Sequence, residues 1–139
     1  MKVVVNRCYG GFGLSDKAIE MVMRRKGLNC FRYKQTKYKF SDGVEEYTRC
    51  DMFNDNSLFT HYQTKDLGEK VNKLPNETYW YYGILDRTDA DLIAVVEELG
   101  KEANGDFASL EVVEIPDDVN WEIDDYDGIE TVHEVHRSW

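Results

Sequence analysis

Residues 3–15, VVVNRCYGGFGLS, decide how the chain begins to fold. Three consecutive valines are typical of a short buried β-strand, because β-branched side chains favour extended backbone. A glycine-rich loop follows at residues 10–13, and Ser15 has the side chain of a good helix N-cap. Apolar residues then recur at helical spacing up to a glycine after residue 26. The stretch therefore predicts a β-α unit whose helix covers about residues 15–26.

The second clear helical pattern covers about residues 89–103, with Thr88 as the expected N-cap. The C-terminal segment predicts a β-hairpin around Tyr126-Asp127-Gly128. We expect an α/β or α+β fold, with a mixed β-sheet, two main helices and this C-terminal hairpin. The other expected elements are strands at 30–33, 58–62, 79–82 and 110–115, with an extension of the third to residue 85, and a hairpin over 38–47. Residues 66–78 are ambiguous, and one short helix carrying Leu67, Val71 and Leu74 is one interpretation of them.

Length and composition predict one domain over residues 1–139, since 42% of the residues are hydrophobic and neither a repeat nor a low-complexity tract is visible. No apolar run approaches the roughly 18 residues of a membrane span, and the first apolar run is too short for a signal peptide. The three cysteines are an odd number without a CxxC pair, which favours a reducing compartment. We therefore expect a cytoplasmic protein.

The net charge of −10 is unevenly distributed along the chain. Residues 1–85 carry a net charge of +4, whereas residues 86–139 carry −14. Such an acidic segment disfavours nucleic-acid binding, which depends on neutralising phosphates. It would suit a basic protein partner, or it would serve solubility alone.

The glycine-rich loop is the first candidate ligand site, because backbone N–H groups between a strand and a helix N-terminus can hold a phosphate or carboxylate. The pattern lacks the third glycine of a dinucleotide fingerprint, whose place falls to Asp16, and it is not a P-loop. The alternative is a tight turn that needs glycine for its backbone conformation. Exposed aromatic residues near residue 80 would supply a stacking surface or permit a homodimer. The candidate ligand-binding residues are Arg7, Gly10, Gly11, Phe12, Gly13, Ser15, Trp80 and Tyr82.

The sequence signals for catalysis and for metal binding are weaker than those for a ligand site at the glycine-rich loop. Cys8, His61 or an aspartate would be the reacting group of an enzyme, but a buried cysteine and a strand histidine are more often structural. His133 and His136 would face opposite sides of a strand, which disfavours joint metal binding. The acidic residues between 117 and 127 lack the spacing of a calcium loop. We expect no metal, no cofactor and no turnover.

Two motifs, CYGGFGLS from Cys8 and IPDDV from Ile115 followed by YDG and a terminal HRSW, resemble a family of small uncharacterised proteins encoded by phages and prophages. The resemblance covers the whole chain and implies a phage protein that acts on its host, by blocking a defence protein or by sequestering or degrading a nucleotide signal. The leading hypothesis is a counter-defence protein that binds a small anionic, nucleotide-like ligand without turnover. The alternatives are an acidic inhibitor of a basic host protein and a small enzyme acting on a nucleotide or related metabolite.

Overall fold

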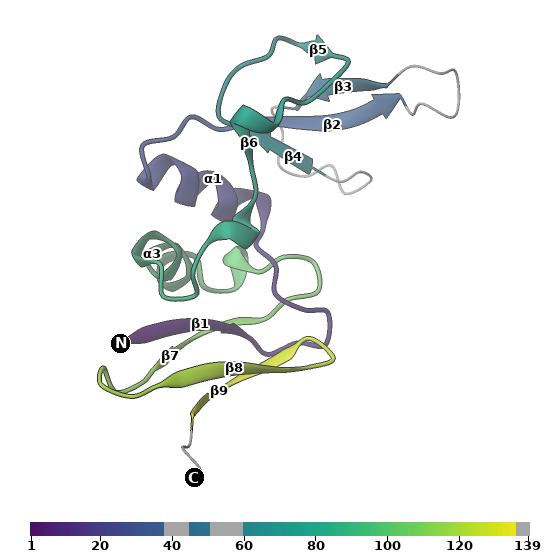
Figure 1. The fold of residues 1–139 in the computed structure, drawn as a ribbon. Coiled ribbons are helices and arrows are strands. Elements are labelled where there is room, and N and C mark those ends of the chain that lie inside the picture. The colour runs from purple at the N-terminus through teal and green to yellow at the C-terminus, as the bar shows by residue number, and fades with distance from the viewer. Residues whose placement is uncertain (38–44, 51–59, 136–139) are drawn as a thin grey trace. The chain divides into compact units, whose positions relative to one another are not determined.

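The computed structural model describes residues 1–37, 45–50 and 60–135. Their contacts divide the chain into two compact units, which are described separately below. The terminal unit comprises residues 1–22 and 83–139, and the central unit comprises residues 23–82. Figure 1 labels their elements. The expectation of one domain stays a prediction.

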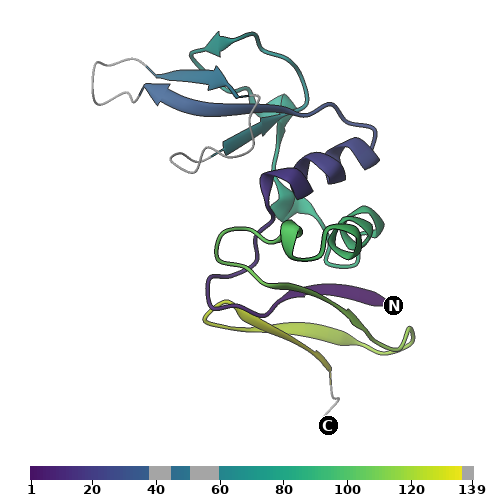
Figure 2. The same cartoon turned by 180° about the vertical axis from the view of Figure 1, so that it is seen from behind.

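The terminal unit is built on two antiparallel strand pairs and a helix (Figures 1 and 2). Strand β1 pairs with β7, and β8 pairs with β9 to form the C-terminal hairpin. Helix α3 contacts both β1 and β7, and β9 contacts β1. The bounds are β1 Lys2–Asn6, α3 Ala90–Leu99, the 3-10 turn η3 Gly100–Ala103, β7 Leu110–Glu114, β8 Trp121–Tyr126 and β9 Ile129–Glu134.

The core of the terminal unit surrounds β1. Val3, Val4 and Val5 are all fully buried, so both faces of the strand are covered. Helix α3 covers one face through its apolar residues, of which Leu92 and Val95 are fully buried, and the β8–β9 hairpin covers the other (Figure 1). The valine run is therefore a strand buried on both faces, and its continuous apolar sequence is what that environment favours.

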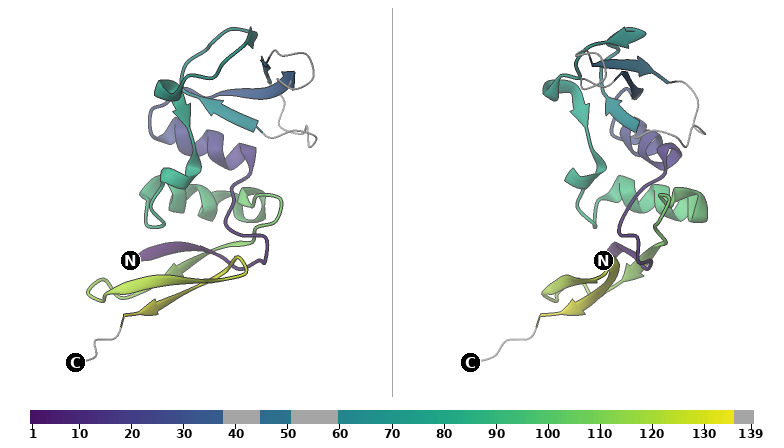
Figure 3. Two further views of the ribbon diagram at one scale, coloured as in Figure 1. Left: turned by 45° about the vertical axis from the view of Figure 1, so that its right-hand side comes forward. Right: turned by 90° about the vertical axis from the view of Figure 1, so that its right-hand side faces the viewer.

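The central unit is a five-stranded antiparallel sheet in the order β5-β3-β2-β4-β6. Figure 3 shows the ribbon of this unit from two further directions. Its strands are β2 Phe31–Lys37, β3 Glu46–Arg49, β4 Thr60–Gln63, β5 Lys70–Val71 and β6 Tyr79–Trp80. The Tyr33 side chain on the central strand is fully buried, and Tyr62 and Trp80 are nearly so. The 3-10 turn η1 Asn76–Thr78 leads into β6, and η2 Tyr82–Ile84 follows it.

Helix α1, Asp16–Arg25, begins in the terminal unit and ends in the central unit, so it connects the two units along the chain. Ser15 caps it as predicted, since the Ser15 Oγ accepts a hydrogen bond from the Ala18 N–H at 3.2 Å. The helix buries Ala18, Ile19, Val22 and Met23. The two main helices and the C-terminal hairpin are confirmed, and the fold is α+β.

Other expectations need correction. The segment with Leu67, Val71 and Leu74 is not a helix but a loop with the short strand β5, because Tyr33 and Asp66 hold its backbone in a turn. The strand expected over 79–85 ends at Trp80 and gives way to η2.

The cap of the second helix also differs from the expectation. Asp89, not Thr88, accepts hydrogen bonds from the first-turn amides. At its other end, α3 stops at Leu99, because Gly100 adopts a φ of +58° there. The expected hairpin over 38–47 and strand at 58–62 extend outside the described residues, at 38–44 and 51–59. Within the described ranges, no helix has the length and apolar character to span a membrane.

Candidate functional site

The glycine-rich loop packs closely against two other segments of the terminal unit. A Cβ atom on Gly10 would overlap the backbone and Cβ of Phe107. A Cβ on Gly128, in the hairpin turn, would overlap the Tyr9 carbonyl and the Gly11 nitrogen. Glycine at residues 10 and 128 therefore permits backbone-to-backbone packing.

Asn6 holds these segments together from inside the unit. Its Nδ2 donates to the carbonyls of Cys8 at 2.7 Å and Gly128 at 2.6 Å. Its Oδ1 accepts from the backbone N–H of Ser109 at 2.8 Å. The Asn6 side chain is fully buried, so these bonds satisfy an amide that would otherwise be costly to bury.

The residues predicted to assist the loop have protein partners. Arg7 Nη1 donates to the Glu130 carbonyl at 2.7 Å, and its Nε pairs with Glu111 at 3.0 Å. Ser15 Oγ donates to the Glu102 carbonyl at 2.6 Å. The Phe12 ring lies 3.7 Å from the guanidinium carbon of Arg87. The structure thus brings the loop, Arg7 and Ser15 into one connected region of the terminal unit, and ligand binding by the loop stays a prediction.

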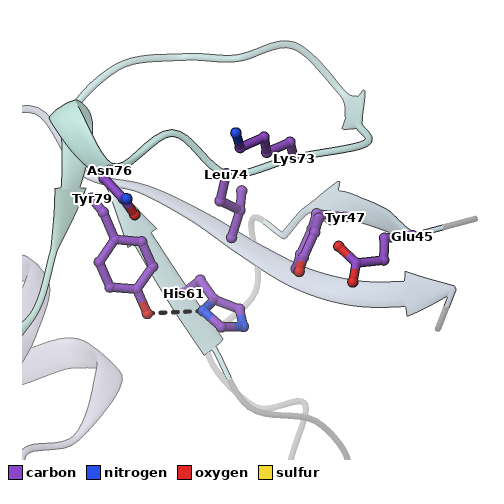
Figure 4. A pocket seen from close by; sticks show the side chains of 7 residues that line it. All are labelled: Glu45, Tyr47, His61, Lys73, Leu74, Asn76 and Tyr79. Carbon is purple, nitrogen blue, oxygen red and sulfur yellow. Dashed lines mark hydrogen bonds between the residues drawn. The ribbon is translucent and has the colours of Figure 1, made fainter. Parts of the chain in front are cut away.

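The central unit contains a pocket of about 330 Å³ beside strands β3, β4 and β6. Figure 4 shows its side chains, which converge from three parts of the sheet and from the loop after β5. The lining residues are Glu45, Tyr47, His61, Lys73, Leu74, Asn76 and Tyr79. Its volume lies at the lower end of the range for small-molecule sites, about 300–1,000 Å³.

His61 lies between two tyrosines in this pocket. Its Nδ1 is 2.9 Å from the Tyr79 hydroxyl, and the tautomer of the imidazole decides which atom donates (Figure 4). The ring centroids of His61 and Tyr47 are 5.7 Å apart and nearly perpendicular, whereas those of His61 and Tyr79 are 5.8 Å apart and tilted. Strand register produces this grouping, because β3 and β4 both pair with β2, where Gln35 lies opposite Tyr47 and Tyr33 lies opposite His61. Residues 33 and 35 share one face of β2, so Tyr47 and His61 project from the same face of the sheet.

Burial favours the neutral forms of the His61 imidazole and of the Tyr47 and Tyr79 phenols. Burial lowers the pKa of His61 below its ordinary value of 6.5. Burial also raises the pKa of Tyr79, with a smaller contribution from Tyr81. The pKa of Tyr47 is raised by burial and then by the negative charge of Glu45. At neutral pH the pocket therefore presents an uncharged imidazole and two protonated phenols, which can donate or accept hydrogen bonds.

Charge distinguishes the two units. The central unit has 11 Lys and Arg against 8 Asp and Glu, a net charge of +3. The terminal unit has 6 basic against 19 acidic side chains, a net charge of −13. Lys73 supplies a cation to the pocket wall, opposite in sign to Glu45. The central unit is therefore the one whose net charge favours an anion.

Two predicted stacking residues, Trp80 and Tyr82, belong to the central unit. The Trp80 side chain is packed into the core with 6% of its surface exposed, and Tyr82 contacts Tyr81. The exposed partners in this aromatic run are Tyr79, which lines the pocket, and Tyr81. The alternation of side chains along a strand predicts that this aromatic run has two faces, but it does not predict which face is buried.

The sequence indicates His61 as a candidate catalytic residue, but it does not indicate its pocket neighbours Tyr47 and Lys73. They lie 14 and 12 residues away along the chain, and Tyr47 reaches the pocket from strand β3 whereas Lys73 reaches it from the loop after β5. The sequence does not indicate the Arg87–Glu130 pair of the terminal unit either. A buried Glu beside an Arg has no short-range sequence signal when 43 residues separate the two.

Comparison of the chain with protein-family models, curated proteins and solved structures gives no match.

Proposed function

We propose that this protein binds a small, planar, anionic ligand of the mononucleotide class in the pocket of the central unit, without turning it over. The observation that carries this proposal is the hydrogen-bonded His61–Tyr79 pair, which places aromatic rings and neutral hydrogen-bonding groups in one pocket that Lys73 also lines. Rings of this kind stack on nucleobases, and an ammonium group pairs with phosphate.

The size and charge of the pocket narrow the ligand class. A volume of about 330 Å³ suits a nucleobase with one sugar-phosphate better than a dinucleotide. The neutral imidazole and Asn76 provide hydrogen bonds for a base edge, and Glu45 provides an acceptor for an exocyclic amine. The resemblance to phage proteins supports a host-directed role in which binding would sequester a nucleotide signal.

Native mass spectrometry of the full chain with nucleobases, nucleosides, nucleoside monophosphates and cyclic nucleotides tests this proposal. We expect a retained ligand mass and no product mass. A changed ligand mass would contradict binding without turnover and support the enzyme alternative. If no panel member binds at millimolar concentration, the proposed ligand class is wrong.

Two pairs of variants locate the site by titration calorimetry. Tyr79→Ala should weaken binding by about 5- to 100-fold, the range expected for loss of one stacking ring. Tyr81→Ala is its control, because Tyr81 is exposed and does not line the pocket. Lys73→Gln should weaken binding of a monophosphate but not of its nucleoside, and Lys70→Gln on β5 should change neither. If Gly11→Ala abolishes binding while Tyr79→Ala does not, the glycine-rich loop is the site instead.

A second candidate function is the binding of a basic protein by the terminal unit. Three segments of the terminal unit meet around Gly10 and Gly128, and they carry Tyr9, Phe107 and Tyr126. These three aromatic residues are 69%, 75% and 74% exposed, respectively. Exposed aromatic residues in a unit with a net charge of −13 suit a partner rich in Arg and Lys. Capture of a purified basic host protein should fall at high salt and with Phe107→Ala, and salt-insensitive capture would contradict it.

A further inference from the structure

The outward face of the β8–β9 hairpin brings together two carboxylates and an imidazole. The register places Glu122 opposite His133 and Asp124 opposite Thr131. Because side chains alternate along strands, Glu122, Asp124 and His133 share one face. The alternate face carries Glu130, which is buried and bonded to the backbone of β1.

Their atoms are close enough to bind one ion. His133 Nε2 lies 2.7 Å from Glu122 Oε1, and His133 Nδ1 lies 3.1 Å from Asp124 Oδ2. One ligand atom from each residue falls within 4.8 Å of the others. Metal–ligand bonds of about 2.0–2.2 Å place the ligand atoms roughly 3–3.5 Å apart. Because the two carboxylates contact opposite nitrogens of the His133 ring, the ring must rotate so that one nitrogen faces both carboxylates, and the ion then replaces these two contacts.

We propose that Glu122, Asp124 and His133 form a binding site for one divalent first-row transition-metal ion of the Zn²⁺ type. The donor set is one imidazole nitrogen and two carboxylate oxygens, which suits Zn²⁺ better than Mg²⁺ or Ca²⁺, because those ions prefer oxygen alone. Three protein ligands leave at least one coordination position to water. The side chains are 39–68% exposed, so the ion can reach them from solvent.

Two further features favour this site. The paired strands hold the three side chains on a fixed register, which limits the entropy lost when they converge on an ion. The terminal unit carries a net charge of −13, which attracts cations. Sequence spacing relates His133 only to His136 and therefore predicts no metal, whereas Glu122 and Asp124 lie on the strand paired with that of His133.

Calorimetric titration of ZnCl₂ into the full chain tests the proposal. We expect one ion per chain, with affinity reduced at least tenfold in His133→Ala and in Asp124→Asn. Glu134→Gln is the matched control, because Glu134 lies on the other face of the same hairpin, and its affinity should stay within twofold of the parent.

Co²⁺ substitution provides a second readout that does not depend on affinity. Visible d–d bands without a thiolate charge-transfer band are expected for nitrogen and oxygen ligands, and His133→Ala should remove them. A thiolate band would assign the ion to cysteine and overturn the proposal. Unchanged zinc affinity in a folded His133→Ala variant, or no zinc binding below millimolar concentration, would also overturn it.

Discussion

Both carboxylate oxygens of Glu130 accept hydrogen bonds from the guanidinium of Arg87, and 6% of the Glu130 side chain is exposed. The same carboxylate accepts the backbone N–H of Asn6 at 2.8 Å. Arg87 in turn stacks on Phe12 and reaches the carbonyl of Val4. This pair therefore ties the hairpin to β1 and to the glycine-rich loop.

Replacing Glu130 with Ala should destabilise the protein by about 2–4 kcal/mol, because it leaves the largely buried guanidinium of Arg87 and the backbone N–H of Asn6 without their acceptor. Urea unfolding measures the change. The control is Glu97→Ala, which removes the exposed pair with Lys2 and should cost much less stability than Glu130→Ala. Equal costs for the two variants would show that burial of the Arg87–Glu130 pair contributes nothing.

Gly10→Ala should destabilise the fold by more than about 2 kcal/mol, since the new methyl group would overlap Phe107. Gly10 does not have a positive φ, so its requirement is steric. Gly27→Ala is the contrasting variant: its Cβ would meet no atom within 4 Å, but its φ is +79°. It should cost about 1 kcal/mol through backbone strain. Thermal unfolding of both proteins measures the difference, and a smaller effect at Gly10 than at Gly27 would contradict this view of the loop.

Local features of the fold could be predicted from the sequence because they depend on neighbouring residues. Ser15 caps α1 through a side chain three residues from its donor. The hairpin turn uses Asp127 and Gly128 with φ values of +50° and +92°, the positive pair that Asp-Gly readily adopts. Neither feature requires knowledge of the rest of the chain.

The pocket and the buried polar pairs could not be predicted in this way. Tyr47 and His61 meet because β3 and β4 both pair with β2, and the register of those pairings is not readable from composition. Asn6 bonds to the carbonyl of Gly128, 122 residues away. Such contacts depend on the tertiary fold, so the sequence identified His61 but not its surroundings.

Asp89→Ala should destabilise the protein by about 1 kcal/mol, because Asp89 Oδ1 accepts the backbone N–H groups of Asp91 and Leu92 at 3.0 Å each. Thr88→Ala removes the residue expected as the cap from the sequence and should change stability by less than about 0.5 kcal/mol. Chemical unfolding compares them directly. A larger loss of stability for Thr88→Ala would show that Thr88, which the sequence predicts as the cap, is the residue that caps the helix.

Tyr33→Phe should destabilise the protein by about 1–3 kcal/mol. The fully buried hydroxyl donates to the Gly68 carbonyl at 2.8 Å and accepts the Leu67 N–H at 2.9 Å, so its loss leaves two backbone groups without their partner. Tyr126→Phe makes the same chemical change at a 74% exposed residue and should have little effect. Indistinguishable unfolding midpoints for these two variants would show that the Tyr33 hydroxyl does not hold the β4–β5 loop.

The folded protein should titrate His61 at a pH below 6.5, because burial lowers the pKa of its imidazole. The unfolded state then binds more protons than the folded state as the pH falls through 6.5, so this group makes the protein less stable on acidification. The loss of stability grows as the pH falls from about 6.5 to the pKa of His61 in the folded protein, and it is constant below that pKa. NMR titration of the His61 ring, assigned by the signal missing in His61→Asn, measures the folded value. Urea unfolding at several pH values should show a shallower pH dependence for His61→Asn than for the parent, and a His61 midpoint at or above 6.5 would contradict the neutral imidazole proposed for the pocket.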